Sequence, residues 1–257
     1  VELSINFDVI RNKDFNWTIG GNLSYNSNKL ISLSNDTYQL EYLKLGNMAH
    51  VQTYSHRVDP NEPIGNFYGW KQDGLKGGGS SWRIVGAENS AAGEEQKHIL
   101  GNGIPKMFAA FYTNLSYNNF DLNISFHGAF LYQILNQYRM MYETLAWVQT
   151  YNVPRSTYQK IGNFYNYAPS TYCDYYIENG DYMKLDNLTL SYRFNCEKFK
   201  YLRNMKVYVS GRNLLTFTSY KGLDPEAVDI TGLTPGVDNL TKYPTSRSVT
   251  IGVNVSF

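Results

Sequence analysis

The chain has few side chains whose types and spacing could support catalysis or metal binding. Its histidines are scattered, with no His-x-x-x-His and no Cys-x-x-Cys spacing; they are His50, His56, His98 and His127. We therefore expect no metal site and no other cofactor. A lipase-like Ser/His pair that includes His127 is conceivable, but polar residues alternate with apolar ones around it, so we expect His127 to line a wet surface. We predict that the chain is not an enzyme.

Two further groups could bind small ions. Gly77–Gly79 resembles part of a phosphate-binding loop, but no Gly-Lys-Ser/Thr follows, so we interpret it as a loop tip. Asp224, Glu226 and Asp229 could gather oxygen ligands around calcium. Because Asp-Pro commonly begins a turn, a turn is the favoured interpretation of this stretch.

Aromatic residues crowd the stretch between residues 132 and 181. Flat rings with a polar edge suit stacking on sugars or packing on peptides at low entropic cost. They could equally pack this stretch against its neighbours or form an aromatic belt at a membrane surface. The candidates for substrate contact are Tyr142, Trp147, Tyr151, Tyr158 and Tyr165, with Tyr167 and Tyr172 close by in the sequence.

The composition narrows the class of protein. The 257 residues include 16% aromatic and only 18% charged residues, and 23 basic residues nearly balance 22 acidic ones. No electrostatic footprint for nucleic acid is present. No run of 18 apolar residues occurs, which excludes a transmembrane helix. A transmembrane β-strand remains possible, because alternating residues average to an unremarkable mean hydropathy of −0.42.

Apolar and polar residues alternate along several stretches, which predicts strands with one apolar and one polar face. The pattern is clearest at the C-terminal end, where Val249, Ile251, Val253, Val255 and Phe257 are apolar. It recurs in three other strong stretches and five weaker ones, giving nine predicted strands. The others are Leu3–Val9, Trp17–Tyr25, Met48–Arg57, Ile64–Gln72, Lys106–Tyr117, Leu122–Phe130, Tyr182–Phe194 and Lys206–Phe217.

Short and long connections alternate between these strands, which is typical of an outer-membrane β-barrel with tight periplasmic turns and large outer loops. The short ones are Asn12–Asp14, Val58–Glu62, Asn118–Asn119 and Asn195–Met205. The long ones are Ser34–Asn47, Asp73–Pro105, Tyr132–Asp181 (with a helix expected near Arg139–Val148) and Thr218–Ser246. Because nine is odd, the first and last strands run the same way and cannot close an antiparallel barrel, so we expect part of a larger assembly.

This topology makes a prediction for the two cysteines. Cys173 falls in a long outer loop and Cys196 in a short inner turn. They would lie on opposite sides of an apolar band about 25 Å tall, whereas a disulfide needs Cα atoms closer than about 7 Å. We expect two free thiols.

Several stretches resemble a known family. Asn179–Tyr192 is similar to the "ENGDYLRLKNLTLGY" strand of SusC/RagA-type TonB-dependent transporters of Bacteroidetes, and Val207–Glu226 to the strand and "YxGxDPE" loop that follow it. Tyr243–Phe257 resembles the closing "YP…GxNxxF" strand. Matches upstream occur in the family's order and extend the resemblance over essentially the whole chain; they are Phe15–Trp17, Asn22–Asn26, Ile64–Gly69 and Gly101–Lys106.

The resemblance implies an all-β fold: a transmembrane antiparallel barrel of 22 strands with an N-terminal plug, of which residues 1–257 would be the last nine or so strands. It also implies a bacterial outer-membrane location and TonB-driven import of oligosaccharides or peptides. A SusD-like surface lipoprotein would close the barrel from outside, and TonB would act through the plug, which these residues lack together with the first strands. Phe257 would be the C-terminal signal read by the barrel-insertion machinery.

Two other classes remain as alternatives. A secreted all-β glycan-binding domain with aromatic loops would need its apolar faces buried against each other. A small barrel enzyme such as a lipase would need an even number of strands and a catalytic triad.

Overall fold

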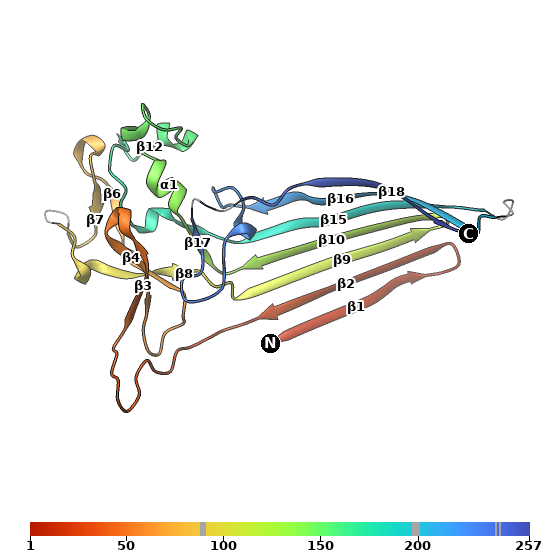
Figure 1. The fold of residues 1–257 in the computed structure, drawn as a ribbon, viewed down its shortest axis with the longest axis horizontal. Coiled ribbons are helices and arrows are strands. Elements are labelled where there is room, and N and C mark those ends of the chain that lie inside the picture. Colours follow the sequence, from red (N-terminus) through yellow and green to blue (C-terminus); the bar gives the residue numbers. More distant parts are fainter. Residues whose placement is uncertain (88–90, 197–200, 240, 242) are drawn as a thin grey trace.

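Seven long strands form one antiparallel sheet, here called the wall sheet (Figure 1). The computed structural model describes residues 1–87, 91–196, 201–239, 241 and 243–257. Neighbouring strands of the wall sheet follow one another in chain order, so no strand crosses over. They are β1 (Glu2–Arg11), β2 (Phe15–Tyr25), β9 (Met107–Tyr117), β10 (Phe120–Phe130), β15 (Tyr182–Phe194), β16 (Asn204–Thr218) and β18 (Ser248–Ser256).

The register of the wall sheet separates an apolar face from a polar face. One row of paired residues across the sheet is entirely apolar: Trp17, Leu115, Leu122, Leu190, Val209 and Ile251. The neighbouring row on the other face is entirely polar: Thr18, Asn114, Asn123, Thr189, Ser210 and Thr250. Many of the apolar side chains are exposed, with Ile251 at 74%. A sheet that presents such a face to its surroundings matches a barrel wall in lipid.

Aromatic rings border this apolar face at the end of the short turns. Phe15 packs edge-on against Tyr117 at a centroid distance of 6.3 Å, and Phe120 lies 4.7 Å from Tyr192. The register places these four residues in one row across four strands. Amphipathic rings favour the level where lipid meets water, so this row is an aromatic girdle.

The opposite end of the wall sheet carries three long connections, residues 26–106, 131–181 and 219–247, which together are called the loop layer (Figure 1). The first contains a four-stranded sheet and a hairpin, and the second contains helix α1 (Gln137–Tyr142). The strands of the loop layer are β3 (Leu43–Met48), β4 (Thr53–Val58), β5 (Asn66–Trp70), β6 (Gln72–Leu75), β7 (Trp82–Ile84), β8 (Lys97–Asn102), β11 (Gln133–Asn136), β12 (Lys160–Ile161), β13 (Phe164–Tyr165), β14 (Ile177–Asn179) and β17 (Val237–Asp238). Short 3₁₀ turns connect them at Ala49–Val51, Gly77–Gly79, Glu94–Gln96, Leu145–Trp147, Arg155–Tyr158, Asp174–Tyr176 and Pro225–Ala227.

The loop layer has a hydrophobic core of its own. Phe67, Leu135, Tyr172 and Tyr176 are almost fully buried and belong to one cluster whose described members all lie in the loop layer. A second, smaller cluster joins the two parts, because it includes Ala129 and Tyr182 of the wall sheet as well as loop residues such as Tyr132 and Tyr220. The loop layer is thus a packed body seated on the wall sheet.

Two of the nine predicted strands are not in the wall sheet. Met48–Arg57 and Ile64–Gln72 do form strands, β4 and β5, but both lie in the loop layer. They have six and five residues, too few for the 9–11 that span a bilayer. The prediction of nine wall strands was therefore wrong, and seven is the number in the described chain. Val58–Glu62 is a short turn within the loop layer. The two long connections predicted at Ser34–Asn47 and Asp73–Pro105 are parts of one connection, residues 26–106.

Other predictions about the topology are confirmed. Three short connections lie at one end of the wall sheet, although residues 197–200 of Asn195–Met205 are outside the described residues. Seven is also odd, so β1 and β18 run the same way and the sheet is open. The helix expected near Arg139–Val148 begins earlier and is shorter. No helix among the described residues has the length and apolar character needed to cross a membrane.

The cysteines are also as predicted. Cys173 and Cys196 are both free and both buried. Cys173 lies in the loop layer, where burial raises the pKa of its thiol, and Cys196 follows β15 at the opposite end of the wall sheet.

The two faces of the wall sheet predict opposite responses to the same substitution. Ile251→Lys would place a charge on the apolar face at a cost of roughly 2–4 kcal/mol near the middle of a bilayer, whereas Thr250→Lys would place it in water. We expect the full-length protein in lipid vesicles to lose urea resistance with Ile251→Lys and to keep it with Thr250→Lys. Equal losses would contradict the assignment of the faces.

Candidate functional site

Three of the five predicted contact residues lie together on the loop layer. The ring centroids of Tyr142 and Tyr151 are 5.5 Å apart, and those of Tyr151 and Trp147 are also 5.5 Å apart. Tyr138, which was not among the predicted residues, extends this group because its ring lies 5.3 Å from Tyr142. These four residues are here called the aromatic cluster. Trp147 and Tyr151 remain 38% and 50% exposed, so ring surface is available to a ligand.

The remaining predicted aromatics lie apart from this cluster. Tyr165 is on β13, where the Lys160 ammonium group sits 5.3 Å from its ring centroid. Tyr158 is exposed and has no ring contact with the aromatic cluster within the described residues. Tyr172 is completely buried and donates a hydrogen bond to the Ser55 carbonyl at 2.8 Å, so its role is to pack the loop layer.

Helix α1 and a buried ion-pair network hold the aromatic cluster in place. Asn136 caps the helix by accepting from the Arg139 backbone N–H at 3.0 Å. One turn later the Arg139 guanidinium group pairs with Glu143, four residues along, and with Glu178 of β14. Tyr175 donates to Glu143 at 3.0 Å. All three charged side chains are at least nine-tenths buried, so the network fixes the orientation of the short helix that carries Tyr138 and Tyr142.

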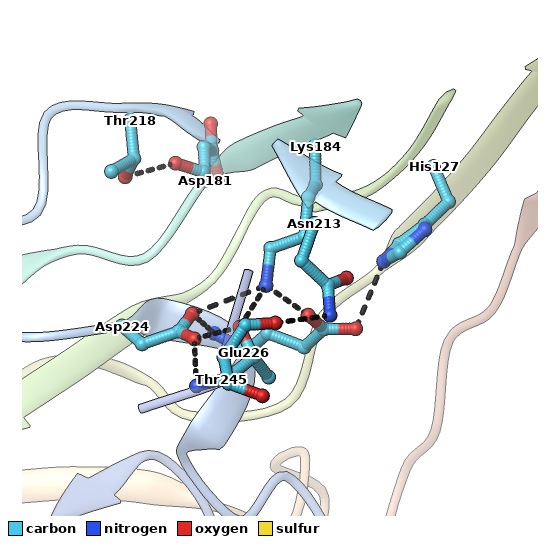
Figure 2. Close-up of polar contacts among 9 residues, drawn as sticks. His127, Asp181, Lys184, Asn213, Thr218, Asp224, Glu226 and Thr245 are labelled. Carbon is cyan, nitrogen blue, oxygen red and sulfur yellow. Dashed lines mark hydrogen bonds and ion pairs between the residues drawn. The ribbon is translucent and has the colours of Figure 1, made fainter. Parts of the chain in front are cut away.

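A second polar cluster fastens the third long connection to the polar face of the wall sheet (Figure 2). The fully buried Lys184 of β15 pairs with Glu226, reaches Asp224 at 3.5 Å and donates to Thr245 at 2.9 Å. Directly opposite Lys184 on β10, the His127 ring lies 2.9 Å from Glu226. The expectation that His127 lies on the polar face is thus confirmed, but its partner is a carboxylate rather than a serine.

Asp224 is the best-satisfied member of this cluster. Burial alone would raise the pKa of its carboxyl group. The carboxylate accepts hydrogen bonds from the Thr245 hydroxyl at 2.5 Å, the Thr245 backbone N–H at 2.9 Å and the Glu226 backbone N–H at 3.0 Å. Together with the charge of Lys184, these bonds lower the pKa overall. The Lys184 ammonium group therefore takes the position that the calcium interpretation would give to a cation. No cluster of three or more metal-ligating side chains occurs among the described residues.

A buried histidine joins the first and third long connections. His56 of β4 contacts the Pro235 carbonyl through Nε2 at 2.9 Å and Ser55 Oγ through Nδ1 at 2.7 Å. A carbonyl can only accept, so Nε2 carries the proton in this arrangement. Burial lowers the pKa of His56 from 6.5 to about 4, although the bond to Pro235 opposes the shift.

Sequence reasoning missed part of this arrangement. His127 was singled out by itself and Asp224 with Glu226 as a possible calcium group, but Lys184, whose Nζ pairs with both carboxylates, was not. The available signal was a lysine within the Asn179–Tyr192 stretch that carries the resemblance, on one of the more weakly alternating predicted strands. Nothing in the sequence indicated that residues 127, 184 and 224–245 would meet.

Removing Lys184 tests the anchoring of the third connection. Lys184→Met would leave Asp224 and Glu226 without their cation, and the loss of one partner of a buried pair costs roughly 3–5 kcal/mol. We expect limited proteolysis of the full-length protein to cut within residues 219–247 faster than in the wild type. The matched variant Lys160→Met, at an exposed position, should leave that rate unchanged. If both variants are cut at the same rate, the Lys184 cluster is not what protects residues 219–247.

The His56 link predicts a pH dependence of the loop layer. Below pH 6.5 His56 becomes protonated in the unfolded chain, whereas in the folded chain it stays neutral until about pH 4. Stability should therefore fall by about 1.4 kcal/mol per pH unit across this interval, about 3 kcal/mol in all, and level off below it. Urea titrations of the full-length protein should show a weaker dependence for His56→Gln. An unchanged pH profile in that variant would assign the effect to other groups.

No protein-family model matches the chain. TonB-dependent receptor P3 of Formosa agariphila is 29% identical over the full chain, which covers 28% of that receptor. TonB-dependent receptor SusC of Bacteroides thetaiotaomicron is 25% identical, again over the full chain, which covers 26% of it. The chain thus spans between a quarter and a third of the length of these relatives.

The fold is also that of a solved transporter. The structure of the RagAB peptide transporter superposes with a TM-score of 0.80 at 21% identity, covering all of this chain and 29% of that one. The same transporter in its open-open state gives a TM-score of 0.75. Along its entire length the chain is thus similar in sequence to part of the receptors named TonB-dependent, SusC among them. Its open wall sheet with the loop layer has the fold of the corresponding part of the RagAB transporter, and the wall sheet matches part of the barrel of such transporters.

Proposed function

We propose that this chain forms barrel wall and outer loops of a transporter that imports bulky nutrients across the bacterial outer membrane, driven by TonB. The observation that carries the proposal is the similarity of all 257 residues to receptors named as TonB-dependent. The exposed apolar face and the aromatic girdle support a location in the outer membrane. The names of the relatives are those of receptors and transporters, which argues against an enzyme and against a secreted glycan-binding domain.

In this proposal residues 1–257 are the C-terminal part of a longer protein, and the plug and the remaining strands belong to the rest of it. The open wall sheet supports this, because β1 and β18 run in the same direction and cannot pair with each other as antiparallel neighbours. Phe257 would then serve as the C-terminal insertion signal. TonB would act through the plug, so no residue of this chain is assigned a role in energy coupling.

The loop layer would face the cell exterior, where a SusD-like surface lipoprotein would cover it. The similarity to SusC and to the RagAB peptide transporter supports such a partner, since the resemblance to their family implies one. The loop layer is large and packed around its own core, so it can present a fixed surface to a partner. The substrate would be an oligosaccharide or a peptide.

Substrate contact is assigned to the aromatic cluster, above all to Trp147 and Tyr151. Their half-exposed rings offer flat surface next to the fixed helix α1. Tyr158 and Tyr165 remain candidates on the same connection, although they lie outside the cluster.

Purification from native outer membranes tests the role of the chain. The denatured polypeptide that contains these residues should have a mass several times 29.5 kDa, and a lipoprotein should co-purify with it in mild detergent. A strain that lacks the TonB-interacting segment of this polypeptide should leave a labelled oligosaccharide or peptide in the medium that the parent strain removes. If both strains deplete every labelled compound equally, TonB-driven import by this protein is wrong.

Substitution of the aromatic cluster tests the contact residues. Because an aromatic anchor commonly contributes about 2 kcal/mol to binding, Trp147→Ala with Tyr151→Ala should weaken binding of the imported compound by roughly tenfold or more. Tyr243→Ala, which removes a highly exposed ring elsewhere on the loop layer, is the matched control. Equal affinities of all three proteins would remove the cluster from the site.

A further inference from the structure

A pocket with a volume of about 400 Å³ opens beside the aromatic cluster, within the range typical of small-molecule sites. Tyr138 belongs both to the cluster and to the lining of the pocket. The second long connection supplies most of the other lining residues, and Lys221 comes from the third. The pocket therefore lies between the second and third long connections, which also meet in the small hydrophobic cluster that contains Tyr132 and Tyr220.

Two cations in this pocket are available to a ligand. Arg155 and Lys221 line it, are exposed, and make no ion pair with another described residue. By contrast, Arg139 at the base is already committed to Glu143 and Glu178. Glu178 also accepts the Lys221 backbone N–H at 2.8 Å, which fixes the backbone from which the lysine projects. An anionic group that entered the pocket would meet unpaired positive charge rather than displace an existing ion pair.

The rest of the lining favours a sugar over a peptide side chain. It offers the hydroxyl group of Ser156, the amide of Gln159 and the rings of Tyr138 and Tyr175. The only carboxylate among its described lining residues is Glu143, which is already paired with Arg139. Apart from Pro154, the described lining has no aliphatic side chain. Peptide recognition draws on apolar pockets and on exposed strand edges, whereas a pyranose ring needs a flat aromatic surface and dispersed polar partners.

We infer that this pocket binds an acidic sugar residue, with its ring against Tyr138 and its carboxylate between Arg155 and Lys221. This inference rests on the proposed import function and specifies its substrate class as a negatively charged oligosaccharide. Both cations would form charge-assisted hydrogen bonds to the carboxylate, which are about twice as strong as neutral ones.

The inference is tested by calorimetry on the full-length protein in detergent, with trigalacturonate as the probe and neutral galactotriose for comparison. We expect trigalacturonate to bind at least tenfold more tightly at low salt, and this preference to shrink as ionic strength rises. The variant that combines Arg155→Gln and Lys221→Gln should lose the preference. The matched variant Lys160→Gln, which neutralises another exposed lysine of the same connection, should keep it.

Each other outcome overturns the inference. Equal binding of the two trisaccharides, or a preference that survives in the double variant, would show that Arg155 and Lys221 do not select a negatively charged ligand. Binding of triglutamate in place of trigalacturonate, with the same sensitivity to the double variant, would assign the pocket to acidic peptides. Absence of binding by any of these probes would also overturn it. The proposed function would survive such a result if the protein still depleted a different compound in a TonB-dependent way. That depletion should then be reduced by Trp147→Ala with Tyr151→Ala.

Because both substituted side chains are exposed, the double variant should fold normally. Its amount in the outer membrane and its proteolysis pattern provide the check, and both should match those of Lys160→Gln.

Discussion

The need to satisfy every backbone N–H and C=O group inside hydrocarbon governs the wall sheet, on which the loop layer rests. No water is available there, so each strand must be hydrogen-bonded on both sides. The wall sheet meets this condition for five of its seven strands, and its outermost strands β1 and β18 each have one paired side. Successive side chains of a strand point to opposite faces, one toward lipid and one toward water, which is why rows of one character cross the sheet. Trp17 shows how far the rule extends, because even its indole N–H finds an acceptor in Thr113 on the apolar face.

The loop layer is organised differently, since water can reach its backbone. Its rigidity comes from a few buried polar contacts between segments that are distant in the sequence. Lys184 binds the third connection to the wall, His56 binds the first connection to the third, and Tyr172 binds the second to the first. Buried polar groups are costly unless they are paired, so each contact is also specific, because a different arrangement of the segments would leave these groups unpaired. The aromatic cluster and the adjoining pocket are held by the Arg139 network beside α1, within the frame that these contacts set.

The wall sheet was largely predictable from the sequence, because a period of two sustained over ten residues is typical of a strand between two unlike surroundings and of little else. Strands such as β10 and β18 lie close to where the alternation predicts them. The errors came from Met48–Arg57 and Ile64–Gln72, where residues such as His56 and Phe67 are buried within a layered body. A weak alternation cannot distinguish that environment from a membrane.

The loop contacts could not be predicted from the sequence. The ring pairs of Tyr142, Trp147 and Tyr151 depend on where α1 ends, and a six-residue helix leaves little periodicity by which to place its end. Lys184 became meaningful only beside Glu226, which lies 42 residues further along the chain.

The separation of the two hydrophobic clusters has a consequence for local opening. A part of a protein with its own core and few connections to the rest can unfold as a cooperative unit while the rest stays folded. Amide hydrogens of β10 and β15 would then exchange with solvent only when the wall itself opens, whereas those of β4, β5 and β8 would exchange in a shared, more frequent event. Tyr132 and Tyr182, which belong to the small cluster between the two parts, mark the boundary between these two exchange regimes.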